Sequence, residues 1–251
     1  MTISLSEREK ELLELLSEDS NLSVSEVSKL LNVSTVTARN DLDSLAEKGF
    51  IIRTRGGAFP AFHPSILERQ KNMIEVKNRI SKQAASIIED GDKIMIEAGT
   101  TTAFVTKFLL GKRDIDIVTN STLILPYARS NPSIHLTMVG GEFRASTESF
   151  VGSIALRELE QFHVRYAFVG TDGFSIESGL TTHLSEGAEI VRKMSMRAEK
   201  TVVVADSSKY GKTGFARVLP LQDVDMLISD SGIEPEVRSR LEEQGIHLVL
   251  V

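Results

Sequence analysis

Apolar residues in the first 48 positions recur at helical intervals, in three groups separated by short polar stretches. Two of the groups begin with a serine that is followed three residues later by a glutamate, which is the spacing of a capping box: Ser6 with Glu9, and Ser23 with Glu26. Ser34 stands where it can cap the third group. The pattern therefore predicts three short helices in this part of the chain.

A predicted hairpin follows the third helix. Gly49 is placed to end that helix. The next segment, FIIRTRGGAF, combines β-branched residues with Gly-Gly, which favours two short strands joined by a tight turn. Three short helices followed by such a hairpin indicate a winged helix-turn-helix domain of α+β class, which we place at residues 1–58.

The remainder of the chain has a different pattern. Residues 59–73 carry both local prolines and are predicted to be a linker, and a helix is expected at about 74–89 with Ile80 and Ala84 on its buried side. Short apolar runs then alternate with helical stretches: KIMIE, IDIVT, IHLTMVG, YAFVG, TVVVAD, DMLIS and IHLVLV. Residues 74–251 are therefore predicted to form an α/β domain with a mostly parallel sheet covered on both faces.

The composition is that of an ordinary globular protein, with 41% hydrophobic and 25% charged residues in a chain of 251. The absence of cysteine excludes disulfides, thiolate metal sites and cysteine nucleophiles, and the five histidines show no metal-ligand spacing. We therefore expect no metal and no cofactor. No apolar run approaches the roughly 20 residues that span a bilayer, and no signal peptide is recognisable. A cytoplasmic protein without a membrane partner is expected.

The net charge gives no indication of nucleic-acid binding. It is −6 for the whole chain, and residues 1–58 hold 7 basic and 10 acidic residues. A surface that binds DNA would therefore have to be a local patch, with the acidic side chains directed away from it.

The third predicted helix has an unusual outward face. At about 100° per residue, Ala38, Leu42 and Leu45 fall on one side and face the core. The opposite side carries Val36, Asn40, Asp43 and Glu47, and Thr37 and Arg39 flank it. An outward valine suits contact with thymine methyl groups, asparagine can pair with an adenine edge, and arginine can reach guanine or a phosphate. The alternative is a small helical bundle whose third helix is simply solvated.

The predicted hairpin adds two arginines. Arg53 and Arg55 alternate with Ile52 and Thr54, which would place both guanidinium groups on one side of a strand beside Gly-Gly. Contact with the minor groove or with phosphates would follow. The alternative is a solvated strand edge.

The run KIMIEAGTTTAFVTKFL predicts a strand, a small flexible loop and the start of a helix. Gly99 lets the backbone approach a ligand closely, and Thr100, Thr101 and Thr102 add hydroxyl donors to the amides at the helix start. Such a loop can hold a phosphate. The same residues could equally be an ordinary helix start.

Other predicted strand ends carry polar residues too: Thr119, Asn120 and Ser121; Gly140, Gly141 and Arg144; Thr171, Asp172 and Gly173; Asp206 and Lys209. In an open parallel sheet the strand carboxyl ends converge on one ligand crevice. Arg144 and Lys209 are candidate partners for an anion, and Asp172 and Glu186 could accept hydrogen bonds from sugar hydroxyls. Each could instead be a turn residue or a surface charge.

The segment LSVSEVSKLLNVSTVTARNDLDSLAEKGFIIRTRGGA closely resembles the N-terminal domain of DeoR-type bacterial transcriptional regulators. Arg39-Asn40-Asp41-Leu42 and Arg55-Gly56-Gly57 match the motifs of that family, whereas Ala38 stands where a larger aliphatic residue is usual. The resemblance implies binding to double-stranded operator DNA. The implied DNA-binding residues are Ser34, Thr35, Val36, Thr37, Arg39, Asn40, Arg53, Arg55, Gly56 and Gly57.

The resemblance extends over essentially the whole chain. EAGTTT, VTNS, GGEFR, VGTDG, GLTT and DSSKYG match the effector domain of the same family in order. That domain resembles ribose-5-phosphate isomerase and the CoA transferases in fold and binds phosphorylated sugars in the family. The implied effector-binding residues are Gly99, Thr100, Thr101, Thr102, Asn120, Gly141, Arg144, Asp172, Gly173, Glu186 and Lys209. Glu97-Ala98 replaces the Asp-Ser that is common in the family.

These observations favour a transcriptional regulator, in particular a repressor of a carbohydrate utilisation operon whose operator binding is modulated by a phosphorylated sugar. A homo-oligomer, a dimer or a tetramer, is expected because operators commonly offer repeated half-sites. One alternative is a sugar-phosphate isomerase-like enzyme with an appended DNA-binding module. Another is a winged helix that binds a protein and lies beside an inactive sensor domain. The sequence identifies neither the sugar nor the operator.

Overall fold

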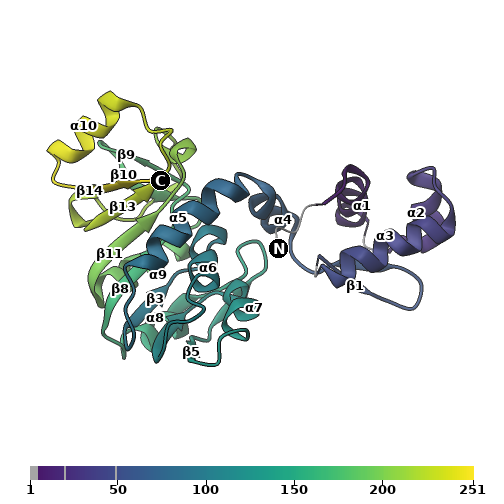
Figure 1. The fold of residues 1–251 in the computed structure, drawn as a ribbon, viewed down its shortest axis with the longest axis horizontal. Helices are drawn as coiled ribbons and strands as arrows, with labels where there is room; N and C mark the ends of the chain where they lie inside the picture. The colour runs from purple at the N-terminus through teal and green to yellow at the C-terminus, as the bar shows by residue number, and fades with distance from the viewer. Residues whose placement is uncertain (1–4, 20, 49) are drawn as a thin grey trace. The chain divides into compact units, whose positions relative to one another are not determined.

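The computed structural model describes residues 5–19, 21–48 and 50–251 (Figure 1). The chain forms two compact units. One comprises the residues up to 71 together with 145–147, and the other comprises 72–144 and 148–251. We refer to them as the N-terminal unit and the sensor unit, and describe each separately.

The N-terminal unit contains the predicted helices and hairpin. Its elements are α1 (Glu7–Glu18), α2 (Val24–Leu30), α3 (Thr35–Glu47), β1 (Ile51–Arg53), β2 (Ala58–Pro60) and α4 (Pro64–Lys71). Both predicted capping boxes are confirmed, because Ser6 and Ser23 each exchange hydrogen bonds with the glutamate three residues later. Leu12, Leu16 and Val27 pack with the inner face of α3 in one apolar core. Gly49, predicted to end α3, lies outside the described residues.

The hairpin differs from prediction in one respect. β1 and β2 pair antiparallel, with Arg53 opposite Ala58. Strand β1 ends at Arg53, and the Thr54 amide donates to the Gly57 carbonyl at 3.1 Å to close the turn. Arg55 therefore lies in the turn, and the expectation that Arg53 and Arg55 share one side of a strand is wrong.

The segment predicted to be a linker has regular structure over most of its length. Phe59 and Pro60 belong to β2, and α4 begins at Pro64, where a proline is favoured in the first turn of a helix. Ile66 and Leu67 are buried, and Leu67 packs into the core of the N-terminal unit. The prolines thus mark a strand end and a helix start, because each fixes φ at a value that both positions accept.

A parallel sheet of seven strands forms the centre of the sensor unit, in the order β14-β13-β11-β8-β3-β4-β5. All six of its strand pairs are parallel. The strands are β3 (Lys93–Ile96), β4 (Ile115–Thr119), β5 (Ile134–Met138), β8 (Val164–Val169), β11 (Ala198–Val204), β13 (Met226–Ser229) and β14 (His247–Leu250). Each corresponds to one of the predicted apolar runs, so the predicted α/β class is confirmed.

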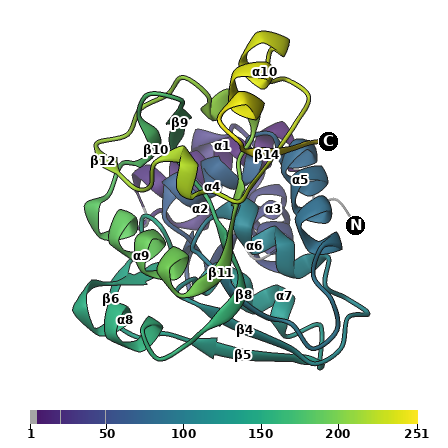
Figure 2. The same cartoon turned by 90° about the vertical axis from the view of Figure 1, so that its left-hand side faces the viewer.

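Helices cover both faces of this sheet. They are α5 (Ile74–Ser86), α6 (Thr100–Lys107), α7 (Leu125–Ala128), α8 (Gly152–Leu159), α9 (Ser185–Met196) and α10 (Pro235–Glu243). Ile94 and Ile96 of β3 face the core under α5 and α6, whereas Met95 faces the core under α8 and α9. Figure 2 shows these two helix pairs on opposite sides of the central strands. Helix α5 ends at Ser86, slightly earlier than predicted.

Two small antiparallel sheets that the apolar pattern did not predict lie in the sensor unit. One joins β9 (Gly173–Ser175), β10 (Gly179–Thr182) and β12 (Ala216–Arg217), and the other is the hairpin of β6 (Glu142–Arg144) and β7 (Ser149–Val151). Three short 3₁₀ helices complete the unit, at Thr122–Ile124, Ser207–Lys209 and Leu221–Asp223. Among the described helices, none is both long enough and apolar enough to cross a bilayer.

Candidate DNA-binding surface and effector site

Helix α3 presents the outward face that its periodicity predicts. Ala38, Leu42 and Leu45 are fully buried, while Val36 is 65% exposed. Arg39 and Asn40 are also exposed, along with Thr35, Asp43 and Glu47. Solvent therefore surrounds a valine, an arginine and an asparagine in the first two turns of α3. That face can meet the edge of a base pair without any rearrangement of the core.

The start of α3 is fixed by its own cap. The Ser34 hydroxyl accepts from the Thr37 amide at 3.0 Å and lies 2.8 Å from the Thr37 hydroxyl. These two hydroxyls hold the first turn in place. Ser34 and Thr37, predicted as DNA contacts, therefore also have a local structural role in this helix.

The acidic residue beside Asn40 points the other way. Asp41 is buried, and its carboxylate accepts from Arg8 Nε at 2.6 Å and from Arg8 Nη2 at 2.9 Å. This bidentate pair links α1 to α3 and removes one negative charge from the outward face. Nothing in the sequence distinguishes Arg8, because a single arginine in an amphipathic helix carries no particular signal.

A second acidic residue of this unit, Glu9, is buried and forms an ion pair that balances its charge. Glu9 accepts from Lys48 Nζ at 2.6 Å and from the Ser44 hydroxyl at 2.8 Å. Burial raises the pKa of this carboxyl, but hydrogen bonds from Lys48, the Ser6 amide and Ser44 outweigh burial and lower the pKa to about 2. Glu9 is therefore ionised at neutral pH and ties α1 to the end of α3.

The hairpin of β1 and β2, which we call the wing, has two glycines in its turn, Gly56 and Gly57, and they have different roles. A Cβ on Gly57 would lie 2.3 Å from the Leu22 carbonyl oxygen, so only glycine fits at this position. The close approach is held by the Val24 amide, which donates to the Gly56 carbonyl at 3.0 Å, and by a bridge between Ser23 and Gly57. A Cβ on Gly56 would meet nothing within 4 Å. Gly57 thus fastens the wing to the start of α2, while Gly56 leaves its tip open.

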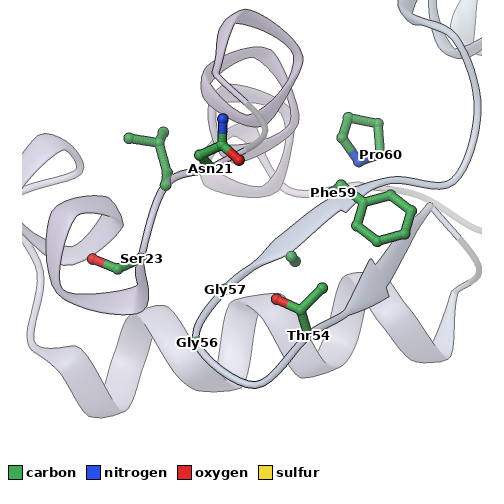
Figure 3. Close-up of a pocket in the computed structure, with 9 residues that line it drawn as sticks. Asn21, Ser23, Thr54, Gly56, Gly57, Phe59 and Pro60 are labelled. Carbon is green, nitrogen blue, oxygen red and sulfur yellow. The ribbon is translucent and has the colours of Figure 1, made fainter.

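Two open hollows flank the wing, each of about 570 Å³. The first lies between the wing and the start of α2, where Figure 3 shows the segment of Asn21 and Ser23 on one side and Thr54, Gly57 and Phe59 of the wing on the other. The second lies between the wing and the starts of α2 and α3. It is lined by Ser23, Val24, Ser25, Thr35, Arg39, Arg53, Thr54, Arg55 and Gly56.

The second hollow, which we call the wing groove, brings together three of the predicted arginines: Arg39, Arg53 and Arg55. Ser23, Ser25 and Thr54 also line it and were not predicted as site residues. The serine at the start of α2 and the threonine next to Gly-Gly are the sequence signals that could have identified them. A groove with three guanidinium groups and several hydroxyls is chemically suited to the phosphates of a duplex.

In the sensor unit, the loop with Gly99 begins α6 as predicted. Gly99 is the N-cap, and helix α6 starts at Thr100. The four predicted residues differ in their accessibility: Gly99 and Thr101 are half-buried, while Thr100 and Thr102 are buried. The Thr102 hydroxyl donates to the Gly99 carbonyl at 2.9 Å, and Ser81 donates to the Thr101 carbonyl at 2.7 Å. The threonine hydroxyl at position 102 therefore stabilises the loop.

Asn120 also stabilises this loop. Only 2% of the residue is exposed. Its Oδ1 accepts from the Ala98 amide at 3.0 Å, and its Nδ2 donates to the Phe150 carbonyl at 3.1 Å. The Asn120 side chain, predicted to contact the effector, is thus buried and links the Gly99 loop to β7 by hydrogen bonds.

Gly141 and Gly173 are positions of close backbone approach. A Cβ would lie 2.5 Å from the Val151 carbonyl at Gly141, which has a φ of 139°, and 2.2 Å from the Lys212 carbonyl at Gly173. Packing alone accounts for glycine at both positions. Neither needs an effector contact to explain it.

Four charged residues of the predicted site remain partly accessible. Arg144 and Glu186 form an ion pair at 3.0 Å, and Asp172 accepts from the Thr182 hydroxyl at 2.8 Å and the His183 amide at 2.9 Å. The Glu186 pKa is lowered by its own backbone amide, the Ser185 hydroxyl and Arg144. Lys209 is half-buried and has no ion pair within the part of the chain that the structure describes. Of the two cations predicted for the effector site, Arg144 thus has a carboxylate partner and Lys209 has none in the described residues.

Glu97 connects the ends of two neighbouring strands. Its Oε2 accepts from the Gly170 amide at 3.1 Å, immediately after β8. The same oxygen is 3.8 Å from the position that a Cβ on Gly99 would occupy. This carboxylate thus lies beside the start of α6. No group of three or more histidine, aspartate or glutamate side chains in the described ranges could hold a metal ion.

Comparison with known proteins agrees with the division into an N-terminal unit and a sensor unit. Residues 8–60 match the DeoR-like helix-turn-helix domain, and residues 72–231 match the DeoR C-terminal sensor domain. The chain belongs to the DeoR family. It is a transcriptional regulator with a DNA-binding domain, and the predicted family is confirmed.

Named relatives support the same conclusion. The chain is 31% identical over 252 residues to a putative aga operon transcriptional repressor of Escherichia coli O157:H7, covering 98% of this chain and 94% of the relative. It is 34% identical over 248 residues to the transcriptional repressor GlcR of Bacillus subtilis, covering 97% and 95%. These relatives are regulators, so the isomerase-like alternative is not supported. A solved D-ribose-5-phosphate isomerase is similar with a TM-score of 0.41 at 21% identity over 55% of each chain, a likeness too loose to bear on activity.

Proposed function

We propose that this protein represses a carbohydrate utilisation operon and that a phosphorylated sugar modulates its hold on double-stranded operator DNA. The proposed binding to operator DNA rests on the exposed face of α3. Val36 on this face is 65% exposed, whereas Ala38, Leu42 and Leu45 on the opposite face are fully buried. A single exposed valine is common on protein surfaces, but a valine, an arginine and an asparagine exposed together in the first two turns of one helix match the groups that contact base edges in the major groove.

The proposed contacts follow from this geometry. Val36, Arg39 and Asn40 read base edges in the major groove, and Thr35 contacts the backbone. Arg55 and Gly56 at the wing tip approach the neighbouring phosphates or minor groove. Ser34, Thr37 and Gly57 act mainly by fixing the start of α3 and the wing, as their hydrogen bonds and packing indicate.

The proposed effector site lies at the start of α6. The first amides of a helix have no partner within the helix, so the backbone beside Gly99 can donate to a phosphate. Gly99 and Thr101 are half-buried, and Lys209 supplies a positive charge at the end of another strand of the same sheet. Asp172 and Glu186 are placed to accept from sugar hydroxyls.

We propose a homo-oligomer, a dimer or a tetramer, that acts in the cytoplasm. Two copies place two recognition helices on repeated half-sites, which multiplies the affinity of one helix. An effector can change DNA affinity only if it binds the DNA-competent and incompetent arrangements unequally.

Thermal-shift screening of the intact protein against a panel of sugar phosphates tests the effector. A ligand that binds the folded state raises the apparent melting temperature, by an amount that grows with the logarithm of its concentration divided by its Kd. The expected result is a shift with a phosphorylated sugar that is absent with the same sugar lacking phosphate. Equal shifts with both would contradict a phosphate site.

A double substitution tests the site itself. Thr100→Ala with Lys209→Ala should leave operator affinity intact and uncouple it from the effector found in the screen. Lys82→Ala, which removes an exposed lysine from α5, is a control for charge. Release of DNA by the double variant at the wild-type ligand concentration would show that the phosphate binds elsewhere.

A further inference from the structure

An ion pair joins the wing to the outward face of α3. Arg53 Nε lies 3.2 Å from Asp43 Oδ1, with 28% of the arginine side chain and 52% of the aspartate side chain exposed. Arg53 is the last residue of β1, and Asp43 lies on the same outward face of α3 as Asn40. An ion pair this exposed is weak and can exchange partners.

The guanidinium of Arg53 is incompletely satisfied where it lies. Its Nη1 atom is buried and has no acceptor among the described residues. A buried donor without an acceptor carries a desolvation cost, and the cost is greater when the donor is charged. An acceptor within reach of a new Arg53 rotamer would therefore stabilise this guanidinium group.

The wing groove is where such an acceptor would lie. Arg53 is one of its lining residues, together with Arg39 and Arg55. The groove borders the exposed start of α3, so a duplex docked on that helix would bring its phosphates to the groove. A phosphate oxygen is a stronger partner for guanidinium than one oxygen of an exposed carboxylate, because it allows charge-assisted, bidentate hydrogen bonds.

We propose that Arg53 exchanges partners when DNA binds: it leaves Asp43 and donates to a backbone phosphate, so that Asp43 acts as an internal competitor of the duplex. This inference rests on the DNA binding proposed above. Phosphates carry no sequence information, so the competition lowers affinity for every duplex equally. Asp43 thus sets the absolute affinity, whereas Val36, Arg39 and Asn40 set the selectivity. The alternative is that the Arg53–Asp43 ion pair is purely structural and holds the wing in place.

The experiment measures the affinity of the full-length protein for its operator, identified by footprinting, and for an unrelated duplex of equal length. Fluorescence anisotropy is recorded from about 50 to 200 mM salt. Arg53→Ala should reduce the slope of log affinity against log salt by about 0.9, the value for one phosphate contact, while Arg53→Lys should keep the slope. Asp43→Asn should strengthen binding to both duplexes about two- to fivefold, which is the range of an exposed ion pair.

Glu47→Gln is the matched control. Glu47 is an exposed acid on the same face of α3 and has no ion pair among the residues that the structure describes. Its replacement removes the same charge without releasing an arginine, so it measures the general electrostatic gain. The gain in DNA affinity from Asp43→Asn should exceed the gain from Glu47→Gln. When Asp43→Asn is added to Arg53→Ala, the gain over Arg53→Ala alone should be no larger than that from Glu47→Gln.

Three results would overturn the proposal. They are an unchanged salt slope in Arg53→Ala, a gain in Asp43→Asn no larger than in Glu47→Gln, and a gain that survives in the double variant. Weaker binding of a folded Asp43→Asn would instead establish the structural pair. Thermal unfolding checks each fold, and if Arg53→Ala unfolds, the Asp43→Asn and Arg53→Lys results decide. Wild-type protein that binds no duplex in a salt-dependent way would overturn the proposed function, and the partner exchange with it.

Discussion

In the N-terminal unit the side chains proposed to read DNA point into solvent, whereas in the sensor unit several side chains predicted to bind the effector hold strand ends together. Val36, Arg39 and Asn40 are exposed on a helix whose core face is complete without them. Asn120 and Thr102 are buried, and their polar groups are hydrogen-bonded to the backbone. The predicted site residues of the two units thus differ in their surroundings: those of α3 are accessible, whereas Asn120 and Thr102 are buried and hydrogen-bonded.

The difference has a physical cause. A helix makes its backbone hydrogen bonds internally, so its outward side chains are available for binding. The end of a strand leaves backbone groups that loops must satisfy with side chains or turns. Polar residues at strand ends therefore often serve the fold first, and those that stay partly accessible, such as Arg144 and Lys209, can still contact a ligand.

The largest effect, a loss of operator selectivity, should come from substitutions on the outward face of α3. Arg39→Ala together with Asn40→Ala should lower the ratio of operator to non-specific affinity by roughly 100-fold or more, because each bidentate base contact contributes about 1–3 kcal/mol. Both residues are exposed, so the free energy of unfolding should change by less than about 0.5 kcal/mol. Competition footprinting gives the ratio. An unchanged ratio would refute the proposed docking of α3.

Glu9 tests whether buried charge stabilises the N-terminal unit. Its pKa is lowered to about 2 from the usual 4.5, so its ionised form contributes stability above about pH 4.5 that is lost as the pH falls through about 2. The contribution is on the order of 3 kcal/mol. Glu9→Gln should remove this pH-dependent part, and exposed Glu11→Gln should not. Urea unfolding at pH 7 and pH 3 measures it; parallel losses in both variants would argue against the Glu9–Lys48 pair.

Asn120 provides the counterpart in the sensor unit. Asn120→Ala should destabilise that unit by about 2–3 kcal/mol, because it leaves the Ala98 amide and the Phe150 carbonyl without their partners. Operator affinity per folded molecule should be unchanged. Thermal unfolding with a near-ultraviolet signal reports the effect. A variant that unfolds like the wild type but no longer binds the effector would restore Asn120 as a ligand contact.

The smallest predicted effect distinguishes the two wing glycines. Gly57→Ala should cost about 1–3 kcal/mol and weaken DNA binding, because its Cβ would overlap the Leu22 carbonyl. Gly56→Ala, with open space around its Cβ, should cost less than about 0.5 kcal/mol. Denaturant unfolding of the pair measures the difference. If Gly56→Ala alone loses affinity while remaining stable, the tip itself contacts DNA.

Local pattern was sufficient for most of the fold. The capping boxes at Ser6 and Ser23 and the burial of Ala38 and Leu42 were predicted because each depends on residues within a few positions of one another. The strands of the parallel sheet were predicted because strands buried on both faces are nearly continuous apolar runs. Helix α4 and the small antiparallel sheets were not, since their short segments carry little periodicity.

The sequence by itself determined the two-unit organisation of apolar patterns, the family, and the outward face of α3, since these depend on periodicities of 3.6 and 2 along the chain. Only the tertiary structure decided which polar residues are already occupied. Arg8 reaches Asp41, Arg53 reaches Asp43 and Asn120 reaches Ala98 across 33, 10 and 22 positions of sequence. The partner of a polar group is set by how helices and strands pack, and no local pattern records that packing.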